Sequence, residues 1–462
     1  MTKRYKLLTI IFSCIFVGIF LLWVNQVLGI ETDVWWHLKF GQEILQGRAV
    51  DGVDTWSWVK ASDGSPLVWV QHEWLFAVIL AIFNYIPGGM YIPAILGHSA
   101  LIAYFLIRLL PKFKTQKQVW FGVFGIVLGI TLAFNPSSRP HSLGFLCVVA
   151  LMDRIWKFEE SKNLKSLFIV PVILLAWTNI WGGTVLLALA MLGTCLLQEF
   201  VLMLRKQPNK FPKLLGIYGI AGLSCFITPA GWRSVFYRFF NSADQSLVSE
   251  WAPLKFLDPQ AVWVFLAIIV LVIFRNKLRL FEWCMSAGFL LLAAMWVRFC
   301  SLPLMLALFI GIYHWDSEVG KIDLSETYKS LWTILVSIAV FFVAVSGASS
   351  VNLDSAAVWN LVSDELLTTI KQTAPERLYT EMDSGYLIYN DIPVFVDSRA
   401  DPFAEFYTET LKVSVGIETF SQLNQKWNFD YAIIRKTSEI VDQFSEYRLV
   451  AEDKFWCFYK LS

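Results

Sequence analysis

Charged side chains are scarce in this chain. Asp, Glu, Lys and Arg together make up 16% of its 462 residues, whereas hydrophobic residues make up 56%. A soluble protein of this length would form a few globular domains in which about a quarter of the residues are charged. The composition therefore predicts a polytopic membrane protein. The net charge of +1 gives no reason to expect a nucleic acid partner, because the Lys and Arg residues sit in short clusters between apolar runs.

Several familiar motifs are also missing. The sequence has no P-loop, GxGxxG or HExxH motif and no recognisable Ser-His-Asp set, which argues against an ATP-driven pump, a zincin and a hydrolase. The seven cysteines fall mainly within apolar runs and form no CxxC pair. We therefore expect neither a disulfide framework nor a zinc site. Any functional residues must be sought in the polar segments between the apolar runs.

Apolar runs of about 16 to 22 residues, the length of a membrane-spanning helix, predict eleven crossings. These runs lie near residues 7–29, 91–110, 118–135, 141–156, 166–181, 184–204, 213–228, 260–275, 281–297, 299–315 and 330–348. The positive charges at Lys3, Arg4 and Lys6 place the N-terminus inside. A twelfth run, 75–86, would move the cluster near Lys112 to the outside if it crossed, so we favour an in-plane or re-entrant helix there. The fold class expected is an α-helical polytopic membrane protein with about 11 to 12 transmembrane helices.

The last part of the chain has an ordinary globular composition. Short β-rich runs at 386–389, 393–396, 430–435 and 455–459 alternate with helix-like segments, which predicts a small extracytoplasmic α/β domain. The expected domains are a transmembrane domain with an outer loop at 30–90, a connector and the α/β domain. Their boundaries are 1–348, 349–369 and 370–462 respectively.

The outer loop is rich in Trp, with six between residues 31 and 74. Because Trp collects where apolar and wet surfaces meet, we expect the loop to lie on a membrane face. Asp33 follows the first apolar run, and a partly desolvated carboxylate there could take a proton from a hydroxyl group or hold a divalent ion. The alternative is a helix cap, because Thr32 or Asp33 precedes a helix-like segment.

Three further polar residues of this loop accompany Asp33. His37 lies four residues later, on the same face of a helix, and His72 and Glu73 close the loop. This set could bind a hard cation such as Mg²⁺ or Mn²⁺, with Asp33 and His72 as the candidate ligands. The alternative is that each His is an ordinary hydrogen-bonded residue at the membrane interface.

Arginines occur at several predicted outer turns, at positions 139, 233, 238 and 298. A guanidinium group at this depth suits a lipid phosphate, because its planar fork can bind two phosphate oxygens. The alternative is that these side chains reach ordinary lipid headgroups. Glu250, next to Trp251, adds an acidic group to the same predicted face.

Taken together, these segments resemble a bacterial group of multi-spanning proteins related to the GT-C glycosyltransferases, which use polyprenyl-phosphate sugars. The resemblance runs over nearly the whole chain. It is carried by TDVWWHLKFGQEIL, VQHEWL, SRPHSLGFL, WTNIWGGTVLL, ITPAGWRSVFY with SEWAP, VRFCSLPL, SGYLIY and VFVDSRADPF. The sequence departs from similar proteins at Trp181, where a His is common, and at Ser398, where a Gly is usual.

The resemblance implies an inverting membrane glycosyltransferase in the bacterial inner membrane. It would transfer a sugar from a polyprenyl-phosphate donor to a glycan, lipid or protein acceptor of the cell envelope, at the outer face. Asp33 matches the catalytic acidic position and would act as base or metal ligand. The expected substrate-binding residues are His37, His72, Glu73, Arg139, Arg233, Glu250 and Arg298. One alternative is a non-catalytic protein of envelope glycan assembly. Another is a lipid-linked glycan transporter, but the scarcity of ionisable residues at mid-membrane depth argues against it.

Overall fold

The computed structural model describes residue 15 and residues 31–50, 52–86, 89–113, 116–134, 137–240, 248–315, 361–381, 384–403 and 406–461. Contacts between residues divide the chain into two compact units. Unit 1 comprises Met1–Trp23, Tyr91–Thr228 and Val248–Ser350. Unit 2 comprises Val24–Met90, Pro229–Leu247 and Val351–Ser462. The outer loop thus shares a compact unit with the C-terminal residues, a grouping different from the domain boundaries that we expect from the sequence.

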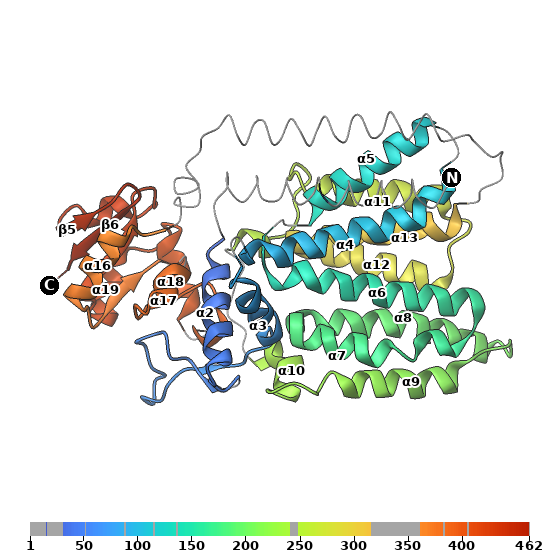
Figure 1. Ribbon diagram of the computed structural model, residues 1–462, viewed down its shortest axis with the longest axis horizontal. Helices are drawn as coiled ribbons and strands as arrows, with labels where there is room; N and C mark the ends of the chain where they lie inside the picture. Colours follow the sequence, from blue (N-terminus) through green and yellow to red (C-terminus); the bar gives the residue numbers. More distant parts are fainter. Residues whose placement is uncertain are drawn as a thin grey trace. The chain divides into compact units, whose positions relative to one another are not determined.

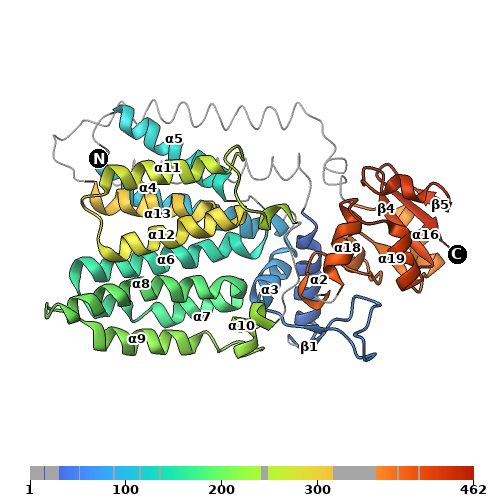
Figure 2. The ribbon, with the colours of Figure 1, turned by 180° about the vertical axis from the view of Figure 1, so that it is seen from behind.

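The described part of unit 1 is built of long helices that lie side by side in both ribbon views (Figures 1 and 2). They are α4 (Ile92–Leu109), α5 (Gln116–Ala133), α6 (Pro140–Ser161), α7 (Val170–Trp181), α8 (Val185–Leu204), α9 (Phe211–Ser224), α11 (Ala261–Phe274), α12 (Leu280–Met295) and α13 (Ser301–His314). Prolines in the first turn of α4, α6, α7 and α9 help to set where these helices begin. The predicted helices at 7–29 and 330–348 lie outside the described residues.

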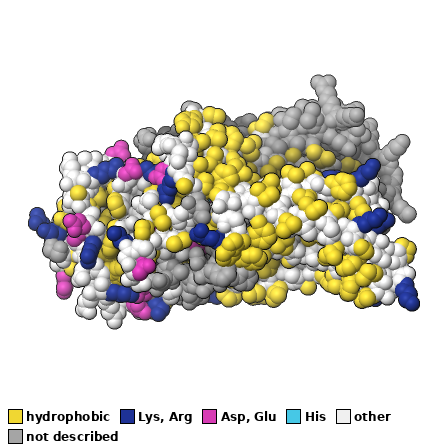
Figure 3. Space-filling view, turned by 90° about the horizontal axis from the view of Figure 1, so that it is seen from below, with side chains coloured by type: hydrophobic (Ala, Val, Ile, Leu, Met, Phe, Trp, Pro, Cys, Tyr) yellow, Lys and Arg dark blue, Asp and Glu magenta, His cyan; other side chains and the backbone are white. Residues whose placement is uncertain are grey.

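Unit 1 has the surface of a membrane protein. Among the described residues, three stretches are long and apolar enough to cross a bilayer: Gly89–Lys112, Leu164–Leu204 and Val297–His314. The helix α11 is apolar on every side and exposes Phe265, Ile269 and Ile273, an arrangement that is stable in lipid. Figure 3 shows hydrophobic side chains over much of the visible surface of this unit. The chain is therefore a multi-pass membrane protein, while the count of 11 to 12 crossings stays a prediction.

Buried acids connect the helices of unit 1. Lys162 donates to Glu159 at 2.6 Å and to Glu199 at 2.7 Å, and so joins α6 to α8. Glu282 of α12 accepts from Trp156 of α6 at 2.9 Å and lies 2.8 Å from His314 Nε2 at the end of α13. Buried charges are tolerated when they are paired in this way. These pairs fix the helices relative to one another within the unit.

A single glycine sets the distance between α4 and α6. A Cβ atom on Gly97 would lie 2.0 Å from the backbone oxygen of Ser142, closer than any real contact. We expect Gly97→Ala to lower the free energy of unfolding by about 1–3 kcal/mol, because the two helices would have to separate. The matched control is Gly193→Ala in α8, where a Cβ meets nothing within 4 Å. Stability is measured by thermal unfolding in detergent, followed by circular dichroism. Equal stability of the two variants would contradict the close packing of α4 against α6.

Unit 2 combines N-terminal and C-terminal segments. Its N-terminal part contains α2 (Asp33–Leu45), the antiparallel strands β1 (Gly52–Val53) and β2 (Val68–Trp69), and α3 (Trp74–Phe83). The segment α10 (Trp232–Phe240) also belongs to this unit. As a ten-residue helix, α3 is about 15 Å long, half the thickness of the hydrocarbon core of a bilayer. The in-plane or re-entrant course that we favour for 75–86 stays a prediction.

The C-terminal part of unit 2 is a small four-stranded sheet with helices, as the sequence predicts. The sheet order is β3-β4-β6-β5, and only the β3-β4 pair is parallel. The strands are β3 (Leu378–Thr380), β4 (Tyr431–Arg435), β5 (Arg448–Glu452) and β6 (Trp456–Lys460), and the helices are α16 (Asp364–Thr373), α17 (Gly385–Tyr389), α18 (Tyr407–Ser414) and α19 (Phe420–Trp427). The β-rich runs at 430–435 and 455–459 are confirmed as strands. The run at 386–389 is helical instead, so that prediction was wrong.

The Trp residues of the outer loop form the core of unit 2. Trp36, Trp56 and Trp69 are between 4% and 7% exposed and belong to one cluster with Trp456, Phe458 and other C-terminal side chains. Aromatic side chains bury more apolar area than most others, whether against lipid or against protein. The Trp-rich composition that suggested a membrane-facing loop reflects, for these three residues, a protein core.

Candidate functional site

Asp33 occupies the first turn of α2 and is 5% exposed. Its Oδ1 accepts a hydrogen bond from Trp36 Nε1 at 3.3 Å and a close one from the hydroxyl of Ser398. Thr32 is the N-cap residue, and its side chain makes no capping hydrogen bond. A carboxylate in a first helical turn is stabilised by the helix dipole. Asp33 is therefore held by two side chains, one of them 365 residues away in the sequence.

Close packing of neighbouring segments positions Ser398 next to Asp33. A Cβ atom on Gly385 would lie 2.2 Å from the backbone oxygen of Thr32, so α17 touches the start of α2 at a position that only glycine fits. Thr380 and Ser384 donate to the carbonyl of Val396 at 3.2 Å and 3.0 Å. These bonds fix the backbone two residues before Ser398.

The other candidates in the outer loop form a chain of titratable groups. His37 Nε2 lies 3.6 Å from Glu73 Oε2, and Glu73 Oε1 lies 3.7 Å from His72 Nε2. His72 Nδ1 is 4.0 Å from Asp401 Oδ2, which brings in a C-terminal residue. Within the described ranges, no three His, Cys, Asp or Glu side chains are grouped so that they could hold a metal ion. The Mg²⁺ or Mn²⁺ site suggested around Asp33 and His72 therefore stays a prediction.

A buried arginine joins the outer loop to the C-terminal segment. Arg399 bonds both oxygens of Asp397, at 2.6 Å to 3.0 Å, and Asp54 Oδ1 at 2.7 Å. Its guanidinium lies 4.7 Å and 4.4 Å from the ring centroids of Trp56 and Trp69. Burial lowers the pKa of Arg399, but the two carboxylates outweigh burial and raise the pKa above its ordinary value. The guanidinium is therefore charged, and it organises this part of unit 2.

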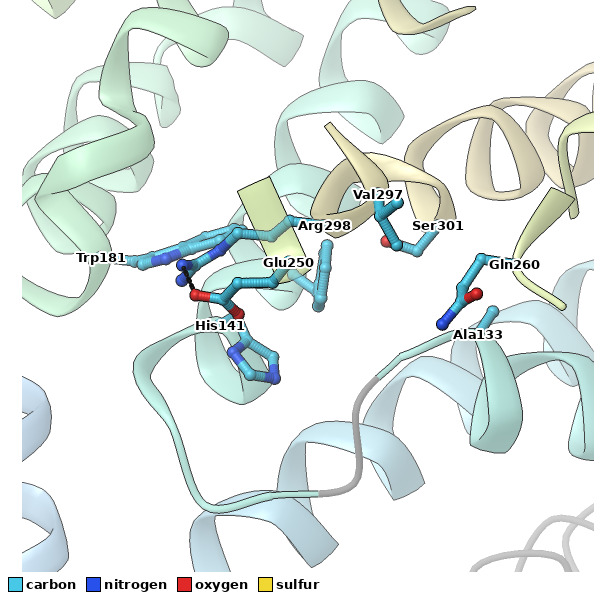
Figure 4. A pocket seen from close by; sticks show the side chains of 9 residues that line it. Ala133, His141, Trp181, Glu250, Gln260, Val297, Arg298 and Ser301 are labelled. Carbon is cyan, nitrogen blue, oxygen red and sulfur yellow. Dashed lines mark hydrogen bonds and ion pairs between the residues drawn. The ribbon is translucent and has the colours of Figure 1, made fainter. Parts of the chain in front are cut away.

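A pocket of about 310 Å³ opens in unit 1 where several helices end. Its polar lining includes His141 at the start of α6, Glu250 from η5 (Ser249–Trp251) and Arg298 from η6 (Val297–Phe299), as Figure 4 shows. The remaining lining residues are Ala133, Phe145, Trp181, Val297, Gln260 and Ser301. This volume is at the low end of the range of ligand pockets, which is about 300–1,000 Å³.

Two arginines share the carboxylate of Glu250. Arg298 Nη1 donates to Oε1 at 2.8 Å, and Arg139 Nη1 donates to Oε2 at 3.4 Å. Burial raises the pKa of Glu250, but Arg298 and Arg139 outweigh burial and hold the pKa below its ordinary value. Glu250 is therefore an anion at neutral pH, and its charge balances part of the positive charge of the two arginines.

The pocket wall is shaped by the sequence departure at position 181. Trp181 ends α7, and its ring packs at 5.2 Å from Phe145. A Cβ atom on Gly144 would lie 2.3 Å from that ring, so the glycine makes room for it. The indole thus contributes an apolar wall beside the charged groups. A positively charged pocket with one apolar wall suits an anionic group attached to an apolar or sugar moiety.

The structure groups some of the predicted site residues and separates others. Arg139, Glu250 and Arg298 come together in unit 1, while Arg233 lies on α10 in unit 2 and is not part of the pocket lining. His37, His72 and Glu73 form the chain described above. The sequence analysis did not propose His141, Gln260, Ser301 or Ser398 as site residues. His141 could have been found, because it adjoins Arg139 in the SRPH segment.

Comparisons with known proteins give little further guidance. No family model matches the chain, and no curated protein matches it. Among solved structures, the chain is similar to the archaeal oligosaccharyltransferase AglB from Archaeoglobus fulgidus, in complex with an inhibitory peptide and a dolichol-phosphate. The TM-score is 0.40 and the identity 11%, over 94% of this chain and 69% of that one. A likeness at this level identifies neither a family nor an activity.

Proposed function

We propose that this protein is a membrane glycosyltransferase that uses a polyprenyl-phosphate sugar and modifies a cell-envelope acceptor at the outer face of the bacterial inner membrane. The observation that carries the proposal is the environment of Asp33. The resemblance in sequence assigns the catalytic acid to this position, and the side chain is buried and held by Ser398 and Trp36. A general base requires such fixed geometry.

In the proposed reaction, Asp33 accepts the proton of an acceptor hydroxyl. The hydroxyl oxygen then attacks the anomeric carbon of the donor sugar from the side opposite the phosphate. The bond between that carbon and the phosphate oxygen breaks, and polyprenyl phosphate leaves with the electron pair. The products are the inverted glycoside, polyprenyl phosphate and protonated Asp33.

The pocket of unit 1 supports the use of a phosphate-bearing donor. Arg298 and His141 line it, and Arg139 contacts the carboxylate of Glu250, which is also part of the lining. Guanidinium–phosphate hydrogen bonds are among the strongest in proteins. We assign binding of the donor phosphate to these residues.

The proposal is tested with the full chain, purified into nanodiscs and supplied with polyprenyl-phosphate sugar labelled in the sugar, together with an envelope extract as acceptor. Labelled acceptor and an equal amount of polyprenyl phosphate are expected. Cells that lack the protein should lack the matching surface glycan. If the chain binds the donor but never cleaves it, the alternative of a non-catalytic glycan-assembly protein replaces the proposal.

Deleting residues 370–462 does not separate these alternatives. Asp397 and Arg399 would be lost, and Asp54 would remain as a buried carboxylate without its counter-ion. The cluster around Trp36, Trp56 and Trp69 would also lose its C-terminal half. Such a deletion is expected to unfold unit 2 under either function, so point variants are needed.

Ser398 provides one such variant. We expect Ser398→Ala to lower kcat about tenfold with KM nearly unchanged, because a hydrogen bond to a charged group contributes roughly 1.5–3 kcal/mol and here orients the proposed base. Ser398→Thr keeps a hydroxyl and should restore most of the rate. The matched control is Ser445→Ala, an exposed serine of the same unit. Equal rates for Ser398→Ala and the control would remove Ser398 from the mechanism.

A further inference from the structure

The pocket of unit 1 already contains an anion. The carboxylate of Glu250 lies between the guanidinium groups of Arg298 and Arg139, at 2.8 Å and 3.4 Å. Figure 4 shows this carboxylate next to the side chains of Arg298 and His141. Gln260 and Ser301, which also line the pocket, are neutral. Glu250 therefore neutralises one of the two fixed positive charges.

Several features of Glu250 suit a displaceable group. Each arginine makes one hydrogen bond to it, although a guanidinium can bind a carboxylate through two parallel bonds. The contact with Arg139 is longer than the usual range for an N–H···O bond. The side chain is 33% exposed, and it is carried by a three-residue 3₁₀ turn rather than by a long helix. A rearrangement of this side chain would therefore break only a few contacts.

We propose that Glu250 acts as an internal counter-ion in the anion site of the pocket, and that the phosphate of a lipid-linked ligand binds by displacing it from Arg139 and Arg298. The inference deepens the proposed function, on which the lipid nature of the ligand rests. A phosphate group offers three oxygens and more negative charge than a carboxylate, so it can accept from both arginines at once. While Glu250 stays paired with the arginines, its negative charge would disfavour the binding of singly charged anions.

The opposite role for Glu250 makes an opposite prediction. If its carboxylate served to hold the arginines in position for the phosphate, removing its charge would weaken phosphate binding. If it competes with the phosphate, removing its charge should strengthen binding. The sign of the effect therefore decides between the two roles.

The test measures binding to the full chain in nanodiscs, with farnesyl phosphate, inorganic phosphate and farnesol as probes. We expect Glu250→Gln to bind farnesyl phosphate roughly tenfold more tightly than the unaltered chain, because the carboxylate no longer competes for the arginines. Glu250→Asp, with its shorter side chain, should fall between them. Arg298→Ala should abolish the gain, and Glu160→Gln, an exposed acid of the same unit, should bind like the unaltered chain.

Unchanged or weaker binding by Glu250→Gln, with an unaltered circular dichroism spectrum, would overturn the proposal. If that variant does not fold, Glu250→Asp is used instead: tighter binding of farnesyl phosphate supports the proposal, and unchanged or weaker binding overturns it. A gain for inorganic phosphate equal to that for farnesyl phosphate would overturn the lipid assignment, and a gain for farnesol would show that charge is not involved. Because the readout is binding, Asp33→Asn should leave it intact, so a failure here is distinguishable from a failure of the proposed transfer reaction.

Discussion

Replacing Asp33 with Asn is expected to lower the rate of sugar transfer by about 10²- to 10⁴-fold, the range for loss of a general base. The amide has the same shape as the carboxylate, and its oxygen can still accept hydrogen bonds from Ser398 and Trp36. The substitution therefore removes the basic group while keeping the contacts that hold it. Donor binding should persist, because the phosphate is assigned to unit 1.

The matched control for Asp33 is Asp364→Asn. Asp364 is also an acid in the first turn of a helix of unit 2, but it is exposed, and its substitution should leave transfer unchanged. Rates are measured from labelled donor in nanodiscs, and the surface glycan of complemented cells gives a second readout. Full activity of Asp33→Asn at a normal protein level would exclude Asp33 as the base and favour the non-catalytic alternative.

The second large effect is expected at Arg399. Arg399→Met should lower the free energy of unfolding of unit 2 by about 3–5 kcal/mol, the usual loss when one partner of a buried ion pair is removed. The side chain is 1% exposed, and its loss would leave Asp54 and Asp397 buried side by side without a counter-ion. Arg399→Lys keeps the charge but not the planar fork, so an intermediate loss is expected.

Adding Asp54→Asn and Asp397→Asn to Arg399→Met should recover part of the stability, because the uncompensated charges disappear together. Arg448→Met, at an exposed position in β5, is the control and should change stability by no more than about 0.5 kcal/mol. Unfolding is followed by Trp fluorescence and limited proteolysis. If Arg399→Met were as stable as the control, the buried ion cluster would not be what holds the outer loop to the C-terminal segment.

The helices of unit 1 were predictable from composition. The runs at 91–110 and 184–204 became α4 and α8 within one or two residues at each end. Their bounds are visible in the sequence, because prolines begin helices and the Gly182-Gly183 pair separates α7 from α8. The arginines and the glutamate of the pocket were found for the same reason, since they lie in the polar turns between apolar runs.

The short elements of unit 2 were less predictable. The segment SGYLIY has the composition of a strand, yet residues 385–389 form a helix, packed against α2 at Gly385. A short apolar run fits either structure, and packing against neighbouring segments decides between them. The environment of the Trp residues in the outer loop was ambiguous for a similar reason. A Trp that faces lipid and a Trp in a protein core cannot be distinguished from the sequence.

The sequence by itself determined that this is a multi-pass membrane protein with a small C-terminal sheet, and it singled out Asp33, Arg139, Glu250 and Arg298. Apolar length, turn residues and charge are local properties, so they can be read without a structure. Only the tertiary structure decided which of these groups meet. The hydroxyl group that donates to Asp33 belongs to Ser398, and Asp54 pairs with Arg399, which lies 345 residues away in the sequence. Such pairs depend on how distant segments pack, which no local pattern encodes.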